Sequence, residues 1–184
     1  MYGLINMAIK QLVLDNFGES GWQNVLDKSG VKQSYFELLS VYDDQITYQL
    51  VSGACQVSGK NPEEILHLFG GYWIDYAIKA GYEPLLKLFG PNFKECLQNL
   101  NRMHDHMGAM MPGLIPPEFE LENEISSTEY HLLYRSKRPG LAPMVSGLLK
   151  ALASRYGIHN LIIEQLKRSE DQEEGTERFH IKWS

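Results

Sequence analysis

The sequence has little cysteine and no long apolar run, and both absences narrow the classes of protein to which it can belong. Its 184 residues include only two cysteines, Cys55 and Cys96, which lie far apart and in no paired motif. This usage predicts two free thiols in a reducing, cytoplasmic setting, with a redox role for either left open. No stretch approaches the roughly 18 uninterrupted apolar residues of a membrane-spanning helix. The opening residues, MYGLINMAIK, also lack the basic start and cleavage site of a signal peptide.

An excess of positive charge is absent as well. The chain has 17 lysines and arginines against 23 acidic residues, a net charge of -6 at pH 7. That balance argues against nucleic acid or an anionic membrane surface as the main partner. Hydrophobic residues make up 43% of the chain and aromatic residues 11%, which is typical of a packed globular protein. The length fits a single domain over residues 1–184, with two lobes around a shared core.

Motifs of catalysis and of metal clusters are missing too. The sequence contains no HExxH, CxxC, EF-hand, G-x-S-x-G or Walker-type pattern. No nucleophile stands beside an acid–base partner, so we expect a binding protein and not an enzyme. The triplet from His104 to His106 does not predict a zinc site, because two rings that are two residues apart on a helix diverge.

Hydrophobic spacing predicts helices in the first two-thirds of the chain and strands in the last third. The expected helices cover about residues 4–13, 22–28, 93–107 and 142–156, and a further helix begins at Asn61 and Pro62. Asn61 and Glu64 are spaced as a capping box. The expected strands cover about residues 119–125, 128–136, 158–167 and 177–183, with a turn at 126–127 and an acidic loop at about 170–175. These elements predict an α+β fold with a small antiparallel sheet of about four strands.

One histidine lies on the apolar face of an expected helix. That face is formed by Phe93, Leu97, Leu100 and His104, which follow one another at steps of three or four residues. At about 100° per residue, the four directions fall within roughly 40° of one another, so His104 points inward and His106 faces solvent. A buried histidine is either a metal ligand or a core residue bonded to a carbonyl. The spacing alone leaves both interpretations open.

A row of polar side chains ends the second expected strand. Because side chains alternate along a strand, Tyr134, Ser136 and Arg138 share one face. They are either the ordinary polar end of a half-exposed strand or a carboxylate clamp, since a guanidinium binds a carboxylate through two parallel hydrogen bonds. An inward histidine together with such a clamp favours heme, a planar apolar cofactor with carboxylates whose iron commonly takes a proximal histidine.

The sequence resembles the heme-nitric oxide/oxygen-binding (H-NOX) domains, which include bacterial gas sensors and the heme domain of soluble guanylate cyclase. Five segments carry the resemblance and span almost the whole chain: MYGLINMAI, NPEEILHLFGGYW, NLNRMHDHM, PGLIPPEF and YRSKRPGLAPMVSGLL. The Tyr-x-Ser-x-Arg pattern is specific when it follows such a histidine by about thirty residues. The resemblance implies the H-NOX fold, with one heme b per chain between a distal helical lobe, about residues 1–65, and a proximal lobe, about residues 66–184.

The resemblance also implies a role for each residue that matches the family pattern. His104 matches the proximal iron ligand, in agreement with its inward direction on the helix. Tyr134, Ser136 and Arg138 match the residues that hold the heme propionates. Pro117 matches a proline that presses on the heme and bends it, and a rigid ring with a fixed φ is suited to that task.

The side of the heme opposite His104 decides which gas is bound. Oxygen-binding members use a distal tyrosine hydroxyl, and Met144 stands at that position here. Trp73 stands where those members have an asparagine, and Ala8 or Ile9 replaces a tryptophan. Lacking a strong donor, the pocket is expected to bind nitric oxide, and also carbon monoxide, in preference to oxygen. The indole N–H of Trp73 remains a candidate weak hydrogen-bond donor to the gas. Packing is nevertheless the simpler role for Trp73, as it is for Met144.

These observations predict a gas sensor that signals by changing shape. Nitric oxide weakens the bond to His104, strain at Pro117 relaxes, and the two lobes shift against each other. The family implies that the shift is read by a histidine kinase, a cyclic-dinucleotide enzyme or a cyclase. Two alternatives stay open. An oxygen carrier or nitric oxide dioxygenase would bind oxygen stably, and a heme-free interaction module would purify without colour.

Overall fold

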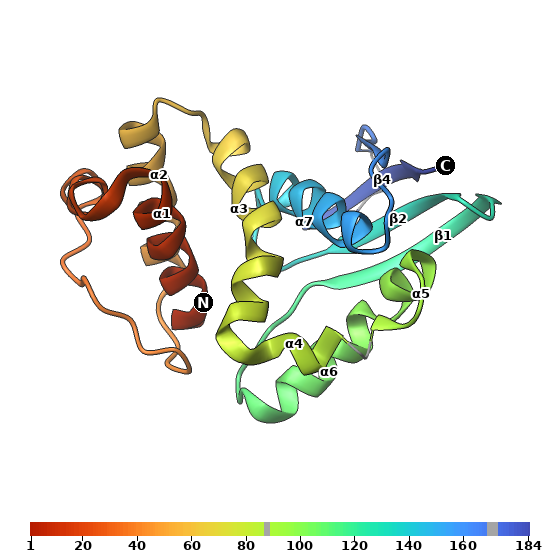
Figure 1. Ribbon diagram of the computed structural model, residues 1–184, viewed down its shortest axis with the longest axis horizontal. Coiled ribbons are helices and arrows are strands. Elements are labelled where there is room, and N and C mark those ends of the chain that lie inside the picture. The colour runs from red at the N-terminus through yellow and green to blue at the C-terminus, as the bar shows by residue number, and fades with distance from the viewer. Residues whose placement is uncertain (87–88, 169–172) are drawn as a thin grey trace.

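Most of the described residues up to Met110 are helical, and the four strands follow, as the hydrophobic spacing predicts (Figure 1). The computed structural model describes residues 1–86, 89–168 and 173–184. Its helices are α1 (Gly3–Ser29), α2 (Asp44–Ser58), α3 (Pro62–Ala77), the π-helical turn η1 (Ile78–Tyr82), α4 (Glu83–Leu86), α5 (Phe93–Gln98), α6 (Leu100–Met110) and α7 (Ala142–Arg155). Its strands are β1 (Glu118–Ser126), β2 (Glu129–Arg135), β3 (Ile162–Gln165) and β4 (Thr176–Lys182).

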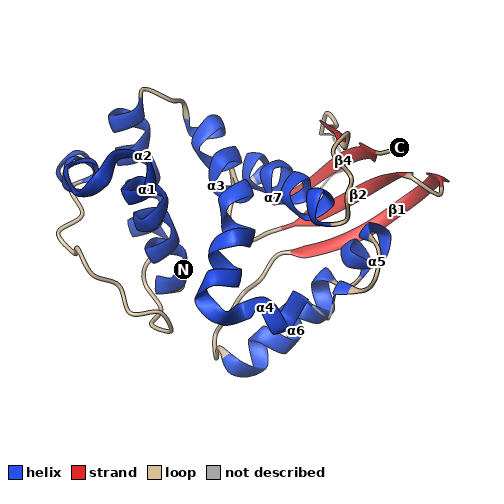
Figure 2. Ribbon diagram, in the orientation of Figure 1, coloured by secondary structure: helices blue, strands red, loops and turns tan. Residues whose placement is uncertain are grey.

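The helical lobe consists of α1 and α2, which pack on each other at one end of the molecule (Figure 2). The two helices expected before residue 30 are joined in α1 across a kink at Gly18, whose φ of 66° only glycine adopts readily, and Gly30 closes the second part. Helix α2 was not predicted individually. It begins after Asp43, whose side chain accepts a hydrogen bond from the amide of Gln45.

Helix α3 lies between the two lobes and contributes to both cores (Figure 1). Its predicted capping box is confirmed: the side chains of Asn61 and Glu64 each accept a hydrogen bond of 2.9 Å from the other's backbone amide. Phe69 packs into the core of the helical lobe and Ile74 into the core beneath the sheet. The expected lobe boundary near residue 65 therefore falls inside a helix that both lobes share.

The last third of the chain forms one antiparallel sheet with the strand order β1-β2-β4-β3. The four predicted strands are confirmed, although β3 is shorter than expected and the turn between β1 and β2 lies at residues 127–128. Inward side chains such as Phe119, Leu132 and Phe179 belong to the same buried core as Leu149 of α7. Residues 170–172 of the expected acidic loop lie outside the described part of the chain.

The helix expected over residues 93–107 is instead two helices that meet at Asn99. This residue has φ and ψ of -94° and 0°, and its side-chain amide donates a hydrogen bond of 3.4 Å to the carbonyl of Phe89. Asparagine interrupts helices because its side chain forms local bonds that compete with the helical ones. Leu100 and His104 therefore share a face of α6, whereas Phe93 and Leu97 belong to α5, although both helices contribute to the same core. None of the described helices combines the length and the apolar character needed to cross a membrane.

Candidate functional site

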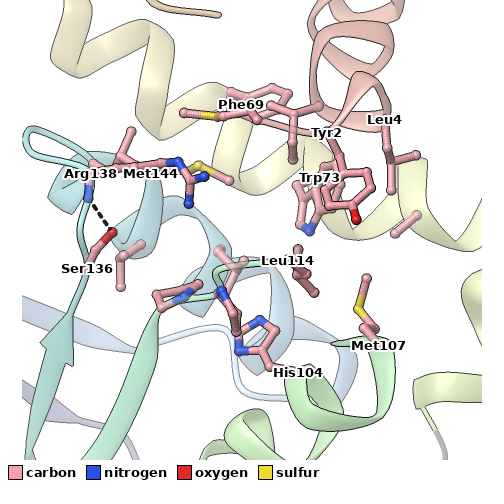
Figure 3. A pocket seen from close by; sticks show the side chains of 18 of the residues that line it. Tyr2, Leu4, Phe69, Trp73, His104, Met107, Leu114, Ser136, Arg138 and Met144 are labelled. Atoms are coloured by element: carbon pink, nitrogen blue, oxygen red, sulfur yellow. Dashed lines mark hydrogen bonds between the residues drawn. The ribbon is translucent and has the colours of Figure 1, made fainter. Parts of the chain in front are cut away.

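An apolar cavity of about 260 Å³ lies between the helical lobe, α3, α6, α7 and the connector at residues 111–117. Figure 3 shows His104 and Met107 on one side of it and Phe69 and Trp73 on the other. All of the site residues expected from the sequence line this cavity: His104, Pro117, Tyr134, Ser136, Arg138, Trp73 and Met144. The fold thus brings together residues from α3, α6, α7, the connector and the end of β2.

His104 presents an uncharged imidazole to the cavity. Burial lowers its pKa, and the backbone of Pro117 and the Asp105 carboxylate offset this only in part. Its ring stacks on Phe119, with 6.0 Å between the centroids, and its buried Nδ1 has no hydrogen-bond partner. A buried polar atom without a partner is uncommon in a folded protein, and the neutral imidazole is the form that binds metals. His106 is exposed, as predicted.

Ser136 and Arg138 line the cavity, but they lie in a turn and not on the strand that the sequence predicted. Strand β2 ends at Arg135, so the alternation of a strand does not extend to them. Instead, the backbone amide of Arg138 donates a hydrogen bond of 3.1 Å to Oγ of Ser136, which closes a turn at the mouth of the cavity (Figure 3). Tyr134 is still within β2 and is only 3% exposed. Burial raises the pKa of its phenol, so the hydroxyl keeps its proton and remains a donor.

The guanidinium of Arg138 is held by two groups that the sequence analysis did not identify. Its Nε donates a hydrogen bond of 2.8 Å to the Asp44 carboxylate, and its Nη1 donates one of 2.8 Å to the carbonyl of Ile115. The α-ammonium group of Met1 also pairs with Asp44. Burial alone would raise the pKa of Asp44, but these two cationic partners lower it overall. Asp44 begins α2, so this ion pair connects the helical lobe to the loop after β2.

Three hydroxyl groups on the cavity wall donate their protons to other protein atoms. Tyr2 donates to the carbonyl of Pro112 at 2.6 Å, Thr47 to Oδ1 of Asn6 at 2.7 Å, and Tyr48 to the carbonyl of Pro139 at 3.3 Å. No sequence motif indicated these bonds, because each joins residues far apart in the chain. They leave the hydroxyls without a proton to offer a small ligand in the cavity.

The rest of the wall opposite His104 is mainly apolar. Met144 and Phe69 line it, and Trp73 stacks beside Tyr76 with 6.3 Å between ring centroids. Of the two residues that could replace the distal tryptophan of oxygen binders, Ile9 lines the cavity, whereas Ala8 packs in the core of the helical lobe.

The cysteines and the acidic side chains form no cluster of potential metal ligands among the described residues. Cys55 and Cys96 are both free, and burial raises the pKa of both thiols, that of Cys96 to about 12. Thiols with a raised pKa form little of the reactive thiolate. No group of three or more potential metal ligands occurs in the described ranges.

Comparison with known proteins identifies the class to which this fold and cavity belong. The sequence pattern of the haem-NO-binding family matches residues 2–165, and the chain therefore belongs to that family of binding domains. The fold is that of the H-NOX proteins. The unliganded Fe(II) H-NOX protein from K. algicida matches with a TM-score of 0.86 at 19% identity, covering 100% of this chain and 97% of that one.

Other known proteins show the same relationship. The S. oneidensis H-NOX protein in its Fe(II)NO state matches with a TM-score of 0.85 at 16% identity, covering 100% of this chain and 99% of that one. Soluble guanylate cyclase gcy-32 of Caenorhabditis elegans is 33% identical over 159 residues, which are 84% of this chain and 23% of the cyclase. The chain thus spans about a quarter of the length of the curated relatives that it matches.

The residues that line the cavity fit the cofactor of this family. A neutral imidazole with an unpartnered buried nitrogen faces an apolar space. At the mouth of the same space lie a guanidinium and two hydroxyl groups, which are suited to carboxylates. Heme has both an apolar ring and carboxylates, and an iron that takes histidine as an axial ligand.

Proposed function

We propose that this chain binds one heme b through His104 and senses nitric oxide. The observation that carries the proposal is the His104 imidazole, which is neutral, faces the apolar cavity and has a buried nitrogen without a partner. When bound, heme supplies an iron at which a diatomic gas coordinates. Each further role below belongs to a residue that lines the same cavity.

The mouth of the cavity would hold the propionates. Tyr134 remains a hydroxyl donor because burial raises its pKa, and Ser136 and Arg138 lie together in the turn after β2. Arg138 uses Nε and Nη1 on protein oxygens, which leaves Nη2 to meet a carboxylate. Pro117 lines the cavity beside His104, where its rigid ring would press against the face of a flat cofactor.

The wall opposite His104 favours nitric oxide over oxygen. Bound oxygen is polar and needs a donor, whereas nitric oxide binds ferrous heme without one. The hydroxyls of Tyr2, Thr47 and Tyr48 already donate to protein atoms, and Met144 stands at the position of the tyrosine of oxygen binders. This pocket therefore supports the selection of nitric oxide, and of carbon monoxide, which also needs no donor.

Signalling would begin at α6, the helix that carries His104. Asn101 of this helix donates to the carbonyl of Phe119 and accepts from its amide, both at 2.8 Å, so α6 is tied to β1. Release of His104 from the metal would free α6 to move, and these bonds would carry the movement to the sheet. A partner protein would then respond. The cyclase relatives place such a domain in a longer chain, and we propose a cyclase or a histidine kinase as the reader.

The absorption spectrum of the reduced, heme-loaded protein tests this proposal. We expect a five-coordinate ferrous spectrum that oxygen leaves unchanged and that nitric oxide converts to a complex without the histidine. The partner's activity should change in parallel. A complex that keeps His104 bound and alters no partner would contradict the mechanism.

One observation favours a second candidate, an oxygen-binding heme protein or nitric oxide dioxygenase. Trp73 lines the cavity and carries an indole N–H, which is a donor of the kind that bound oxygen requires. Under this alternative the protein forms a stable oxygen complex that Trp73→Phe abolishes. A wild-type spectrum that does not respond to oxygen would exclude it.

A further inference from the structure

Three aromatic side chains of α3 form a continuous row that begins at the cavity lined by His104. Trp73 lines that cavity, opposite His104 (Figure 3), and its ring stacks on Tyr76 with 6.3 Å between the centroids and 28° between the planes. Tyr76 in turn lies beside Tyr72, with 6.0 Å between their centroids and 31° between their planes. Side chains three and four residues apart are neighbours on a helix, so the rings share one side of α3. We call these three side chains the aromatic row.

The aromatic row ends in a hydrogen bond to a carboxylate at the protein surface. The Tyr72 hydroxyl donates to Oδ2 of Asp15, an exposed residue of α1, at 2.8 Å. Hydrogen bonds from Gln11 and Tyr72 lower the pKa of Asp15, so this carboxyl group is ionised and can act as a base. Burial and the neighbouring Asp15 raise the pKa of the Tyr72 phenol, which therefore keeps its proton at neutral pH.

We propose that the aromatic row conducts single electrons from Tyr72 to the heme site and thereby protects that site against hydrogen peroxide. The inference rests on the heme binding of the proposed function and not on the identity of the gas. Among aromatic side chains, those of tryptophan and tyrosine give up an electron far more readily than that of phenylalanine. Trp73, Tyr76 and Tyr72 are therefore suited to pass an electron from ring to ring.

The oxidant in this reaction is hydrogen peroxide, which takes up two electrons and two protons and becomes two molecules of water. One electron comes from the bound heme and the other from Tyr72, by way of Tyr76 and Trp73, and each of these two rings is oxidised and then reduced by the next one. The phenol proton of Tyr72 passes along the hydrogen bond to Asp15, so that Tyr72 ends as a neutral phenoxyl radical. Asp15 meets the geometric requirement for a base, which must lie within hydrogen-bond reach of the proton that it takes. Solvent supplies the second proton.

Two other tyrosines at the cavity lack such a base. Tyr2 and Tyr48 donate to the carbonyls of Pro112 and Pro139, and a carbonyl oxygen is too weak a base to take up the phenol proton. The aromatic row instead leaves the radical on Tyr72, at the surface.

The cavity wall contains side chains that this transfer would spare. Met107 and Met144 line it, and oxidation converts methionine to the polar sulfoxide, which disrupts apolar packing. Electrons delivered from Tyr72 would reduce the heme site before these thioethers are oxidised.

The test exposes the ferric, heme-loaded protein to hydrogen peroxide in the presence of a nitroso spin trap. We expect peptide mass spectrometry to find the trap on Tyr72 of the wild type, and freeze-quench EPR to show a tyrosyl signal that Tyr72→Phe removes. Tyr76→Phe interrupts the aromatic row without changing the cavity wall, because Trp73, and not Tyr76, lines the cavity. This variant should lose most of the Tyr72 adduct and should form several-fold more sulfoxide at Met107 and Met144. Tyr35→Phe, at a position that is 69% exposed, is its control.

The role of Asp15 has a matched control on the same helix. Asp15 and Asp27 are both exposed and each accepts a hydrogen bond from a glutamine four residues earlier, at 2.8 Å and 3.1 Å. Asp15→Asn should lower the yield of the Tyr72 adduct several-fold, whereas Asp27→Asn should leave it unchanged. Wild-type protein without an adduct on Tyr72, or an adduct that persists in full in Tyr76→Phe and Asp15→Asn, would overturn the proposal. Failure of the proposed function has other signatures: the chain retains no heme, or the heme-loaded protein forms the Tyr72 radical but does not respond to nitric oxide.

Discussion

His104 and Asp44 show how the local environment of a single residue sets its charge state. Burial lowers the pKa of His104 and so favours the neutral form that our proposed metal ligand needs, and ion pairing lowers the pKa of Asp44 and so favours the charged form that pairs with Arg138. Burial disfavours the charged form of a residue, whereas a nearby opposite charge favours it. Both effects keep a residue of the site in the protonation state that its proposed role needs. Each leads to a substitution with a predictable result.

Replacement of His104 by glycine should abolish normal heme binding and leave a space that free imidazole can fill. Loss of partners that merely orient a metal ligand weakens metal binding by roughly 10- to 100-fold, so loss of the ligand itself should cost more than about 100-fold. Heme titration with and without imidazole measures this effect. His106→Gly, an exposed position on the same helix, is the control and should bind heme as the wild type does. Equal binding by both variants would assign the metal to another residue.

The ion pair between Asp44 and Arg138 predicts a pH dependence of stability. Because the pKa of Asp44 is lowered in the folded state, the pair stabilises the protein above the unfolded pKa of about 3.9. This contribution is lost as the pH falls through the folded value. We therefore measure the free energy of unfolding in urea between pH 6 and pH 3. On acidification over this range, Asp44→Asn should lose less of that free energy than the wild type does.

Asp43→Asn is the matched control for the acid measurement. Asp43 caps α2 through its side chain, and asparagine is an equally good cap. This variant should therefore keep the wild-type stability at pH 6, where Asp44→Asn should be less stable. If Asp44→Asn were as stable as Asp43→Asn at that pH, the ion pair with Arg138 would not contribute measurably in solution.

At the scale of whole elements, the crossing of α3 and α7 positions the distal wall. A Cβ atom on Gly70 would lie 2.0 Å from the carbonyl oxygen of Met144, and one on Gly147 would lie 2.0 Å from that of His67. The two helix backbones therefore touch directly. This close contact brings Met144 of α7 next to Phe69 and Trp73 of α3 on the same cavity wall.

Two adjacent glycines of α3 provide a matched test of this crossing. Gly70→Ala should destabilise the protein by about 1–3 kcal/mol, because the added methyl group meets a backbone oxygen that cannot move freely. Gly71→Ala should be neutral or up to about 1 kcal/mol stabilising, since its Cβ would lie 4.0 Å from the nearest atom and alanine favours helix. Denaturant unfolding of both variants measures the difference. Similar stabilities would show that the helices separate at little cost.

At the scale of the whole molecule, the core of the helical lobe and the core beneath the sheet meet at the cavity that His104 lines. Trp73 packs against both, and the Asp44–Arg138 pair connects the lobes at the mouth. A ligand that fills the space between two cores adds contacts to both of them at once. Heme should therefore stabilise the folded chain as a unit.

Heme loading should raise the Tm of the protein. A ligand that binds only the folded state stabilises it by about 4 kcal/mol when its free concentration is 1,000 times its Kd. Differential scanning calorimetry of the heme-free and heme-loaded protein measures the shift, and His104→Gly should show a smaller one. An identical Tm with and without heme would contradict binding between the cores.

The sequence by itself determined those features that depend on residues close together in the chain. The capping box of Asn61 and Glu64 and the four strands follow from short-range hydrogen bonding and alternation. The pattern from His104 to Arg138 likewise indicated the site residues. Their assembly at one cavity, however, became visible only in the folded structure.

Only the tertiary structure decided the features that depend on contacts between distant segments. The pairing of Arg138 with Asp44 and the hydrogen bond from Tyr2 to Pro112 join parts of the chain that no local pattern relates. The break at Asn99 is local, but the spacing of apolar residues did not predict it. The apolar residues on both sides of the break are buried, so their spacing continues across it. Periodicity reports which side chains are buried, whereas packing between elements decides which of them meet.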